Sequence, residues 1–595
     1  MTLKSFSSCV SSKCVDPTVP QQEHPHRPSR ARSDRTPLPP SPPPSPSPSP
    51  SPSPSPPLPP SPPPPLPPPH PPRASAPAQS LQTSKVISIG SQSLIVAAFD
   101  FGTTYSGYAF SSKDSPNDVK TNKNCTTGSG KLISFKTPTS VLLNKDGEFN
   151  SFGFDAEDKY STLAEDGKHY GWRLFRRFKM VLHNQCISRS ATVEDLEGKT
   201  FKAKPIFTMS LKYLQKHLLD ALSMRTIGTR ETDIRYIITV LAIWGIAAKQ
   251  FMREAAIEAG IDTARLKLAL EPEAAAVCCE DLGHTLVGQK FMVVDLGGGT
   301  ADISVHEKQS DGSLKNIHAP SGGPWGGIYV DANFIAFMEE AFGTLAINAL
   351  QSKDMYDYFD IIRDFEVKMR KFEFDSQTDI TFRIPVTVNH ISGILKEERI
   401  KDVGLIVLVG GFAESPYVQH RIKEELPGMK MIVPGEAGLA VLKGAVMFGH
   451  KPDIISSRVM DYTYGIDVHR KYDEKKHPAE KKVYEDGKWG VKDFFKIFVR
   501  SNEEVQVDSK VTHLSIPRAE HSKIRIYRTK DRDPAYTTDP GFEQLGLIEI
   551  VNNTDIPLKE QTIETTFMFG DTELHVFCEN VKTGKVETLT LDMNK

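Results

Sequence analysis

The stretch that decides the fold is Phe291-Met-Val-Val-Asp-Leu-Gly-Gly-Gly-Thr-Ala-Asp-Ile-Ser-Val-His306. Its first four residues form a short apolar run that is typical of a buried strand. Apolar residues return with period two at Ile303 and Val305, which predicts a second strand. Three glycines separate the two runs and predict a tight turn, whose bare backbone N–H groups can wrap an anion.

Two aspartates flank this glycine turn, Asp295 before it and Asp302 after it. Carboxylates beside a phosphate-binding turn indicate a cation between them, and hydrated Mg²⁺ is the usual one. The alternative is a glycine-rich hairpin that carries two surface aspartates and binds nothing.

A second hairpin of the same kind occupies residues 94–110. An apolar run again ends in an aspartate, Asp100, and a Gly-Thr-Thr turn leads to a second run that begins at Tyr105. The two hairpins are separated by a domain-scale length of chain. We therefore expect two similar lobes, each of which offers a phosphate-binding turn to a shared cleft.

A third glycine turn follows the apolar strand that begins at Leu405 and closes at Gly411. Ser415 and Pro416 come next and read as the N-cap and first residue of a helix. A helix start directly after a glycine turn presents its positive end to an anion or a nucleotide sugar.

These motifs support a family resemblance. Asp100-Phe-Gly-Thr-Thr, Asp295-Leu-Gly-Gly-Gly-Thr-Ala-Asp and Val409-Gly-Gly-Phe resemble the two phosphate motifs and the adenosine motif of the actin-like ATPase superfamily. Within it, the chain resembles the 70-kDa heat-shock protein family, and specifically its atypical twelfth subfamily, from about residue 94 to the C-terminus. Five segments carry this closer match: Ala242-Ile-Trp, Lys249-Gln-Phe-Met-Arg, Leu270-Glu-Pro-Glu-Ala-Ala, Ser321-Gly-Gly-Pro and Gly410-Gly-Phe-Ala-Glu.

The resemblance implies an α/β fold, with a two-lobed actin-like ATPase domain of ribonuclease H-like repeats over residues 94–455. Lobe I would span about 94–290 and lobe II about 291–455. Period-two patterns after residue 462 predict strands at 512–516, 523–527, 546–551, 564–568, 573–578 and 586–591. We therefore expect a β-sandwich-like C-terminal domain at 456–595, without the helical lid that is usual in the family.

Helices are predicted between these motifs. The run 237–241 reads as a buried strand, and 247–259 as a helix closed by Gly260. Residues 268–282 and 356–372 read as two further helices, the second of them clearly amphipathic. A strand at 380–386 followed by a helix at 389–399 leaves the chain shorter here than the family pattern, so a segment near 384–400 is expected to be missing.

Composition sets limits on the function. The net charge is −2, which gives no basic field for nucleic acid, and no apolar run is long enough to cross a bilayer. Seven scattered cysteines and the lack of a signal peptide are typical of a cytoplasmic protein. Residues 1–93 read as a disordered tail, with proline and serine making up nearly all of 39–72. That run predicts a flexible tail, and a ligand for SH3- or WW-type adaptors is the less favoured alternative.

The resemblance also implies site residues for ATP or ADP with Mg²⁺. Asp100, Asp295 and Asp302 would hold hydrated Mg²⁺, and Glu271 would orient the attacking water, so that Glu271, Asp295 and Asp302 form the catalytic set. The remaining nucleotide-binding residues would be Gly102, Thr103, Thr104, Tyr105, Gly297, Gly298, Gly299, Thr300, Glu366, Arg370, Gly410 and Gly411.

The chain departs from the family pattern at several positions of this site. Trp172 stands where the family has a catalytic lysine. Arg173 and Arg176 are the candidates for the missing charge, although nothing in the sequence assigns it to them. The other departures are Leu241 and Lys249 at the pair that couples the domains, Met369, Phe412 and Glu414 around the nucleoside, and Gly438 in place of an aspartate.

These residues predict an ATP-binding, chaperone-like protein with weak hydrolysis, which binds client polypeptides or protein partners through residues 456–595. One alternative is a nucleotide-binding scaffold without significant turnover. A second, less favoured alternative is an enzyme resembling a sugar kinase, against which the β-rich C-terminus argues.

Overall fold

The computed structural model describes residues 93–591, apart from 123–124, 127–132, 184–186, 226–228, 282, 284–286, 373–384 and 486. The predicted tail at 1–93 and its adaptor-binding run lie outside this part of the chain, except for Ser93. Among the described residues, no helix has the length and apolar character that crossing a membrane requires.

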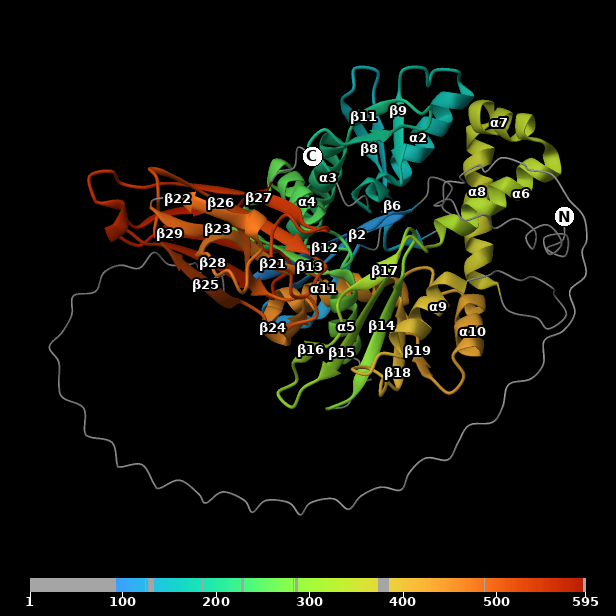
Figure 1. Cartoon of the computed structure of the whole chain (residues 1–595). Helices are drawn as coiled ribbons and strands as arrows, with labels where there is room; N and C mark the ends of the chain where they lie inside the picture. The colour runs from blue at the N-terminus through green and yellow to red at the C-terminus, as the bar shows by residue number, and fades with distance from the viewer. Residues whose placement is uncertain are drawn as a thin grey trace, which may run out of the picture. The chain divides into compact units, whose positions relative to one another are not determined.

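A first sheet is built around the hairpin at Asp100, with strand order β13-β12-β1-β2-β3, in which β13 is Leu266–Leu270 and β3 is Ser115–Thr121. Figure 1 labels β2, β12 and β13 of this sheet. Strand β1 (Ile95–Phe101) pairs antiparallel with β2 (Tyr105–Ser112) and parallel with β12 (Ile234–Val240). Strand β1 is buried along its whole length, because both faces of the sheet are covered. The predicted hairpin and the predicted strand at 237–241 are therefore confirmed.

Helices cover the two faces of this first sheet. The helices α3 (Ala203–Ser223) and α4 (Ile246–Glu258) share a hydrophobic core with one face. The helix α11 (Ala440–His450), which comes much later in the chain, packs on the other face together with α5 (Glu271–Asp281). The helix predicted at 247–259 is confirmed as α4, and Gly260 takes a φ of +107° directly after it.

A second sheet is built around residues 291–306, with order β19-β18-β14-β15-β16-β20-β24. Its edge strand β19 is Lys430–Ile432. Strand β14 (Lys290–Leu296) pairs antiparallel with β15 (Ala301–Lys308) and parallel with β18 (Leu405–Val409). Helix α5 contacts β14 and β15, and helices α9 and α10 share a core with the same strands. The hairpin and the strand at 405–409 are confirmed, and the mixed α/β class is confirmed with them.

Two helices agree with the patterns that predicted them. Helix α10 (Pro416–Glu425) has Ser415 at its N-cap, as predicted. Helix α8 (Met355–Lys371) confirms the amphipathic pattern, since Phe359, Ile362 and Phe365 are buried.

Two predicted elements are wrong in part. Residues 268–270, placed in a helix, form the end of strand β13 (Leu266–Leu270), because they continue the parallel register with β12. The helix begins only at Glu271, just before Pro272, a residue that favours a first helical turn. The strand predicted at 380–386 lies mostly outside the described residues, but Pro385 and Val386 open helix α9 (Pro385–Ile394).

Helix α9 ends at Ile394, before the predicted end at residue 399, and its buried residues Val388, Ile391 and Ile394 recur every three positions against the second sheet. Earlier in the chain, two short strands follow one another, β6 (Thr137–Pro138) and β7 (Ser140–Leu143).

The C-terminal part forms two antiparallel sheets that share a hydrophobic core. One has the order β22-β23-β21-β26-β27-β31 and the other β25-β28-β29-β30. The structure confirms the predicted strands as β25 (Ser509–Ser515), β26 (His521–Thr529), β27 (Glu543–Val551), β28 (Ile563–Phe569), β29 (His575–Asn580), β30 (Lys585–Thr588) and β31 (Thr590–Leu591). It adds β21 (Thr463–Lys471), β22 (Lys482–Glu485) and β23 (Lys488–Val499), which were not predicted.

The second sheet and the C-terminal part share two strands. Strand β20 (Ile455–Val459) joins the second sheet through β16 (Leu314–Asn316), and β24 (Glu504–Gln506) pairs with β20. The chain therefore returns to the second sheet after β23 has been formed. The exact domain limits stay a prediction.

Candidate functional site

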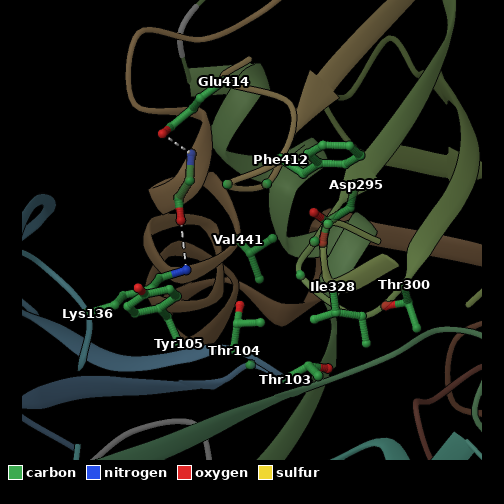
Figure 2. A pocket seen from close by; sticks show the side chains of 18 of the residues that line it. Thr103, Thr104, Tyr105, Lys136, Asp295, Thr300, Ile328, Phe412, Glu414 and Val441 are labelled. Carbon is green, nitrogen blue, oxygen red and sulfur yellow. Dashed lines mark hydrogen bonds between the residues drawn. The ribbon is translucent and has the colours of Figure 1, made fainter. Parts of the chain in front are cut away.

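The two glycine hairpins and the third glycine turn line one cavity of about 450 Å³ (Figure 2). Helix α8, the first residue of α5 and the loop before α11 complete its wall. The lining includes all the predicted site residues except Asp302: Asp100, Gly102, Thr103, Thr104, Tyr105, Glu271, Asp295, Gly297, Gly298, Gly299, Thr300, Glu366, Arg370, Gly410 and Gly411. Residues from distant parts of the sequence are thus brought together at one place.

The glycine turns come so close to one another that side chains would not fit. A Cβ on Gly298 would overlap the side chain of Thr104, and a Cβ on Gly299 would lie 2.7 Å from Thr103 Oγ1. Gly410 has a φ of +90°, and a Cβ there would overlap the Asp295 carboxylate. At Gly298 and Gly299 the backbone is therefore left without side-chain cover toward the cavity, as an anion cradle requires. The N–H groups of Gly297 and Gly410 are already used, because they donate to the carbonyl oxygens of Thr300 and Ala437.

Four carboxylates are buried at the floor of this cavity or just behind it. Asp100, Asp295, Asp302 and Glu271 are each less than 8% exposed. Burial raises the pKa of Asp295 to about 8, with the charges of Glu271 and Asp100 adding to the shift. Burial also raises the pKa of Asp302 well above its usual value, and the negative charges of Glu271 and Asp295 raise it further.

Such a cluster is suited to a divalent cation. Neither carboxylate oxygen of Asp302 makes a hydrogen bond of ordinary geometry with the described residues, although the backbone of Ile243 lies nearby. Oxygen ligands and waters are what Mg²⁺ takes in proteins, and a bound cation would remove the cost of holding these acids together. The described residues contain no group of three such side chains that could ligate a metal directly, so the residues present fit Mg²⁺ that is held through water.

Two lysines that the sequence analysis missed supply positive charge here. Lys136 donates hydrogen bonds to Asp100 Oδ2 at 2.6 Å and to the carbonyl oxygen of Gly438 at 2.7 Å. Lys179, which is 2% exposed, donates to Glu271 Oε1 at 2.7 Å. Lys179 lies only three residues after Arg176 in the sequence. This closeness to the two candidate arginines is the signal from which a positive charge at Lys179 could have been predicted.

The expected substitutes for the missing catalytic lysine lie elsewhere, which corrects that prediction. Arg173 Nε pairs with Asp195 at 2.6 Å, and Arg176 Nε pairs with Glu157 at 2.8 Å. Neither arginine lines the cavity. Trp172 packs against a hydrophobic cluster, with the Lys159 ammonium 5.3 Å from its ring centre.

The end of the cavity beside helix α8 is crossed by a short chain of polar side chains. The Tyr105 hydroxyl donates to Glu366 Oε2 at 2.8 Å, and Arg370 donates to Glu366 Oε1 at 2.5 Å. Glu414 accepts a hydrogen bond from the backbone N–H of Gly438 at 3.0 Å, on the same residue that binds Lys136 through its carbonyl (Figure 2). Gly438 is therefore a junction between the Lys136 and Glu414 side chains.

Comparisons with known proteins agree with this geometry. A family model described as "Hsp70 protein" matches residues 96–390. Heat shock 70 kDa protein 12B of Homo sapiens is 28% identical over 623 residues, which cover 84% of this chain and 91% of the relative. Heat shock 70 kDa protein 12A of Mus musculus is 28% identical over 637 residues, with 87% and 94% covered.

A bacterial relative extends the match beyond that subfamily. The chaperone protein DnaK of Thermosipho melanesiensis is 24% identical over 539 residues, which cover 83% of this chain and 80% of the relative. The matches to the 12A and 12B proteins have a higher identity than the match to DnaK and span more of both chains. The chain belongs to the Hsp70 family as an atypical member.

Proposed function

We propose that the protein binds ATP or ADP with Mg²⁺ in the cavity between the two glycine hairpins, within a two-lobed actin-like ATPase domain at about residues 94–455. The observation that carries this proposal is the convergence of three glycine turns and four buried carboxylates on one cavity of about 450 Å³. Phosphoryl transfer needs positioned phosphates and neutralised charge more than covalent chemistry, and this site offers both.

The charges of the site support a nucleotide that carries a metal. In their ionised forms Asp100, Asp295, Asp302 and Glu271 bring four negative charges, and Lys136 and Lys179 bring two positive ones. Burial raises the pKa of Asp295 and of Asp302 and so opposes this ionisation. A divalent cation favours the ionised carboxylates and offsets that cost. Mg²⁺ held through water by the three aspartates would neutralise phosphate charge, while the N–H groups of the glycine turns would hold the phosphate oxygens.

We assign to Glu271 the orientation of the attacking water, and to Lys179 the task of fixing Glu271. Burial raises the pKa of Glu271, and the adjacent Lys179 ammonium opposes that shift. The carboxylate is thereby kept available to accept a proton from water. Tyr105, Glu366 and Arg370 would hold the nucleoside, and the C-terminal sheets at 456–595 would bind client polypeptides or protein partners in the cytoplasm.

The alternative of a scaffold that binds nucleotide without significant turnover is supported by a different observation. Tyr105 reaches Glu366 on helix α8, and Lys136 reaches the loop before α11, so polar contacts already span the cavity. A site that is held closed in this way would bind and release nucleotide slowly. A calorimetric titration with MgATP, followed by single-turnover hydrolysis on the same sample, separates the two functions.

We expect Lys179→Met to lower the single-turnover hydrolysis rate about a hundredfold while MgATP affinity changes less than fivefold. The reason is that Lys179 holds the water-orienting carboxylate and contacts no phosphate-binding turn, and losing one such electrostatic contact typically costs two to three orders of magnitude in rate. Lys168→Met, at an exposed lysine, is the matched control. An unchanged hydrolysis rate in Lys179→Met would remove Lys179 and Glu271 from the mechanism.

Deleting residues 1–91 should leave the melting temperature and the nucleotide affinity unchanged. A segment so rich in proline and serine has almost no apolar surface to add to a core. Differential scanning calorimetry of the full and shortened chains measures this directly. A drop of several degrees in the shortened chain would mean that the tail stabilises the folded body and is more than an adaptor-binding extension.

A further inference from the structure

A second cavity, of about 90 Å³, shares no lining residue with the nucleotide cavity. Its wall comes from the segment that leads into α4, from strand β20 and the residues after it, and from the turn between β28 and β29. It therefore lies where α4, which packs on the first sheet, meets the C-terminal sheets. Ion pairs between Arg253 and Glu573 and between Lys267 and Asp571 join the same two parts of the chain.

Three polar side chains on this wall lack an acceptor within the described part of the chain. The indole Nε1 of Trp244 and the hydroxyl of Thr572 are buried without a hydrogen-bond partner there, in side chains that are 4% and 5% exposed. The ammonium of Lys249 likewise makes no hydrogen bond and no ion pair with the described residues. An indole N–H and an ammonium can only donate. A ligand that satisfies these donors must therefore offer hydrogen-bond acceptor atoms. A metal cation offers none and is excluded.

The remaining charges of the wall have ion-pair partners, except for Asp461, which accepts a hydrogen bond from a neutral hydroxyl. Arg458 is bound by Glu273 through two hydrogen bonds of 2.7 and 2.6 Å, and Arg528 by Glu543. Glu573 is paired with Arg253 of α4, and Asp571 is paired with Lys267 of β13. Asp461 accepts from the Tyr464 hydroxyl at 3.4 Å.

Lys249 is thus the cation of this wall that has no counter-ion in contact. Burial lowers the pKa of its ammonium, and the charge of the more distant Asp461 opposes that shift. A water molecule can accept from Trp244, but it cannot neutralise the Lys249 charge. A small anion does both.

We propose that this cavity is a binding site for a small oxyanion of the size of inorganic phosphate, held by the Lys249 ammonium, the Trp244 indole N–H and the Thr572 hydroxyl. The volume exceeds the roughly 30 Å³ that one water molecule occupies in the liquid. An oxyanion presents several acceptor oxygens in different directions, which three donors on separate elements require. Lys249 lies in α4, Trp244 lies just before α4, and Thr572 lies in the turn between β28 and β29. A bound oxyanion would therefore link the start of α4 to that turn.

One contact between side chains links the site to the nucleotide cavity. The ammonium of Lys179, which holds Glu271, lies 5.0 Å from the centre of the Trp244 ring. Any test with phosphate must therefore separate binding in the second cavity from binding at the glycine turns. The Trp244 indole N–H gives a direct signal, because a hydrogen bond to an anion shifts its resonance downfield.

The experiment uses the full chain labelled with ¹⁵N at tryptophan, which gives four indole signals for Trp172, Trp244, Trp325 and Trp489. The Trp244 signal is the one missing in Trp244→Phe. We expect inorganic phosphate to shift this signal saturably. Lys249→Met should weaken the binding at least tenfold, Lys249→Arg should keep it, and Lys216→Met, at an exposed lysine of α3, should not change it.

Two further arms decide the ligand class and the location. Sodium chloride at equal ionic strength should give no saturable shift, and Gly298→Val, which closes the phosphate turns of the other cavity, should leave the titration unchanged. The proposal is overturned if phosphate gives no saturable shift, if chloride reproduces it, if Lys249→Met retains it, or if Gly298→Val abolishes it.

Discussion

Gly298→Val should lower the affinity for ATP at least about a hundredfold, which corresponds to roughly 2.7 kcal/mol of binding free energy. A Cβ at this position would overlap Thr104, so a valine must push apart the two turns that are expected to hold the phosphates. The backbone oxygen of Gly298 also lies against Gly326, which leaves the turn no room to move in that direction. Isothermal calorimetry with MgATP measures the loss.

Gly404→Val is the matched control, because a Cβ at Gly404 meets nothing within 4 Å and its φ is not positive. The control should bind ATP like the natural chain. Asp295→Asn adds a variant of nearly the same size that removes one metal-binding charge, and it should also lose most of the affinity. If Gly298→Val melts like the natural chain and still binds ATP with unchanged affinity, the assignment of the phosphate turns is wrong.

Arg458→Met should lower the free energy of unfolding by about 3–5 kcal/mol, the usual cost of leaving one partner of a buried ion pair alone. The side chains of Arg458 and Glu273 are 9% and 2% exposed and are joined by two hydrogen bonds. A third hydrogen bond links Arg458 to the carbonyl oxygen of Gly570. One side chain on β20 thus ties helix α5 to the turn after β28, and urea denaturation measures what that tie contributes.

The double variant Glu273→Leu with Arg458→Met is the informative comparison. It leaves no uncompensated charge, so it should recover more than half of the lost stability. Lys216→Met removes an exposed pair with Asp220 on α3 and should cost less than about 0.5 kcal/mol. A loss below about 1 kcal/mol in Arg458→Met would show that the pair does not hold the two parts of the chain together.

The two glycine hairpins and the helices α8 and α10 could be predicted because their sequence patterns lie within one short stretch of chain each. The apolar run before Asp295, the glycines after it and the period-two residues beyond them specify a strand, a turn and a strand without help from the rest of the chain. The same holds for the N-cap at Ser415 and for the amphipathic pattern of α8. Charged residues on that helix could be assigned to the nucleoside end only through the family resemblance.

The positive charges of the site could not be predicted from such local signals. Lys136 reaches Asp100, and Lys179 reaches Glu271 across 92 residues of sequence, because the sheet brings their elements together. The expectation that Arg173 or Arg176 would replace the missing lysine failed for the same reason, since each arginine meets a nearer acid. Residues 268–270 were wrongly predicted as helical, because the strand β12 with which they pair lies about thirty residues earlier in the chain.

The central claim is that the buried carboxylates and glycine turns hold a nucleotide together with Mg²⁺. The direct measurement is a calorimetric titration of the full chain with ATP, in the presence of Mg²⁺ and again in the presence of EDTA. We predict one saturable site with Mg²⁺ and at least tenfold weaker binding without it. The reason is that Lys136 and Lys179 bind Asp100 and Glu271, whereas the buried carboxylates of Asp295 and Asp302 would then have no cation to offset them near the phosphates. No detectable binding with Mg²⁺, or equal affinity with and without it, would contradict the account.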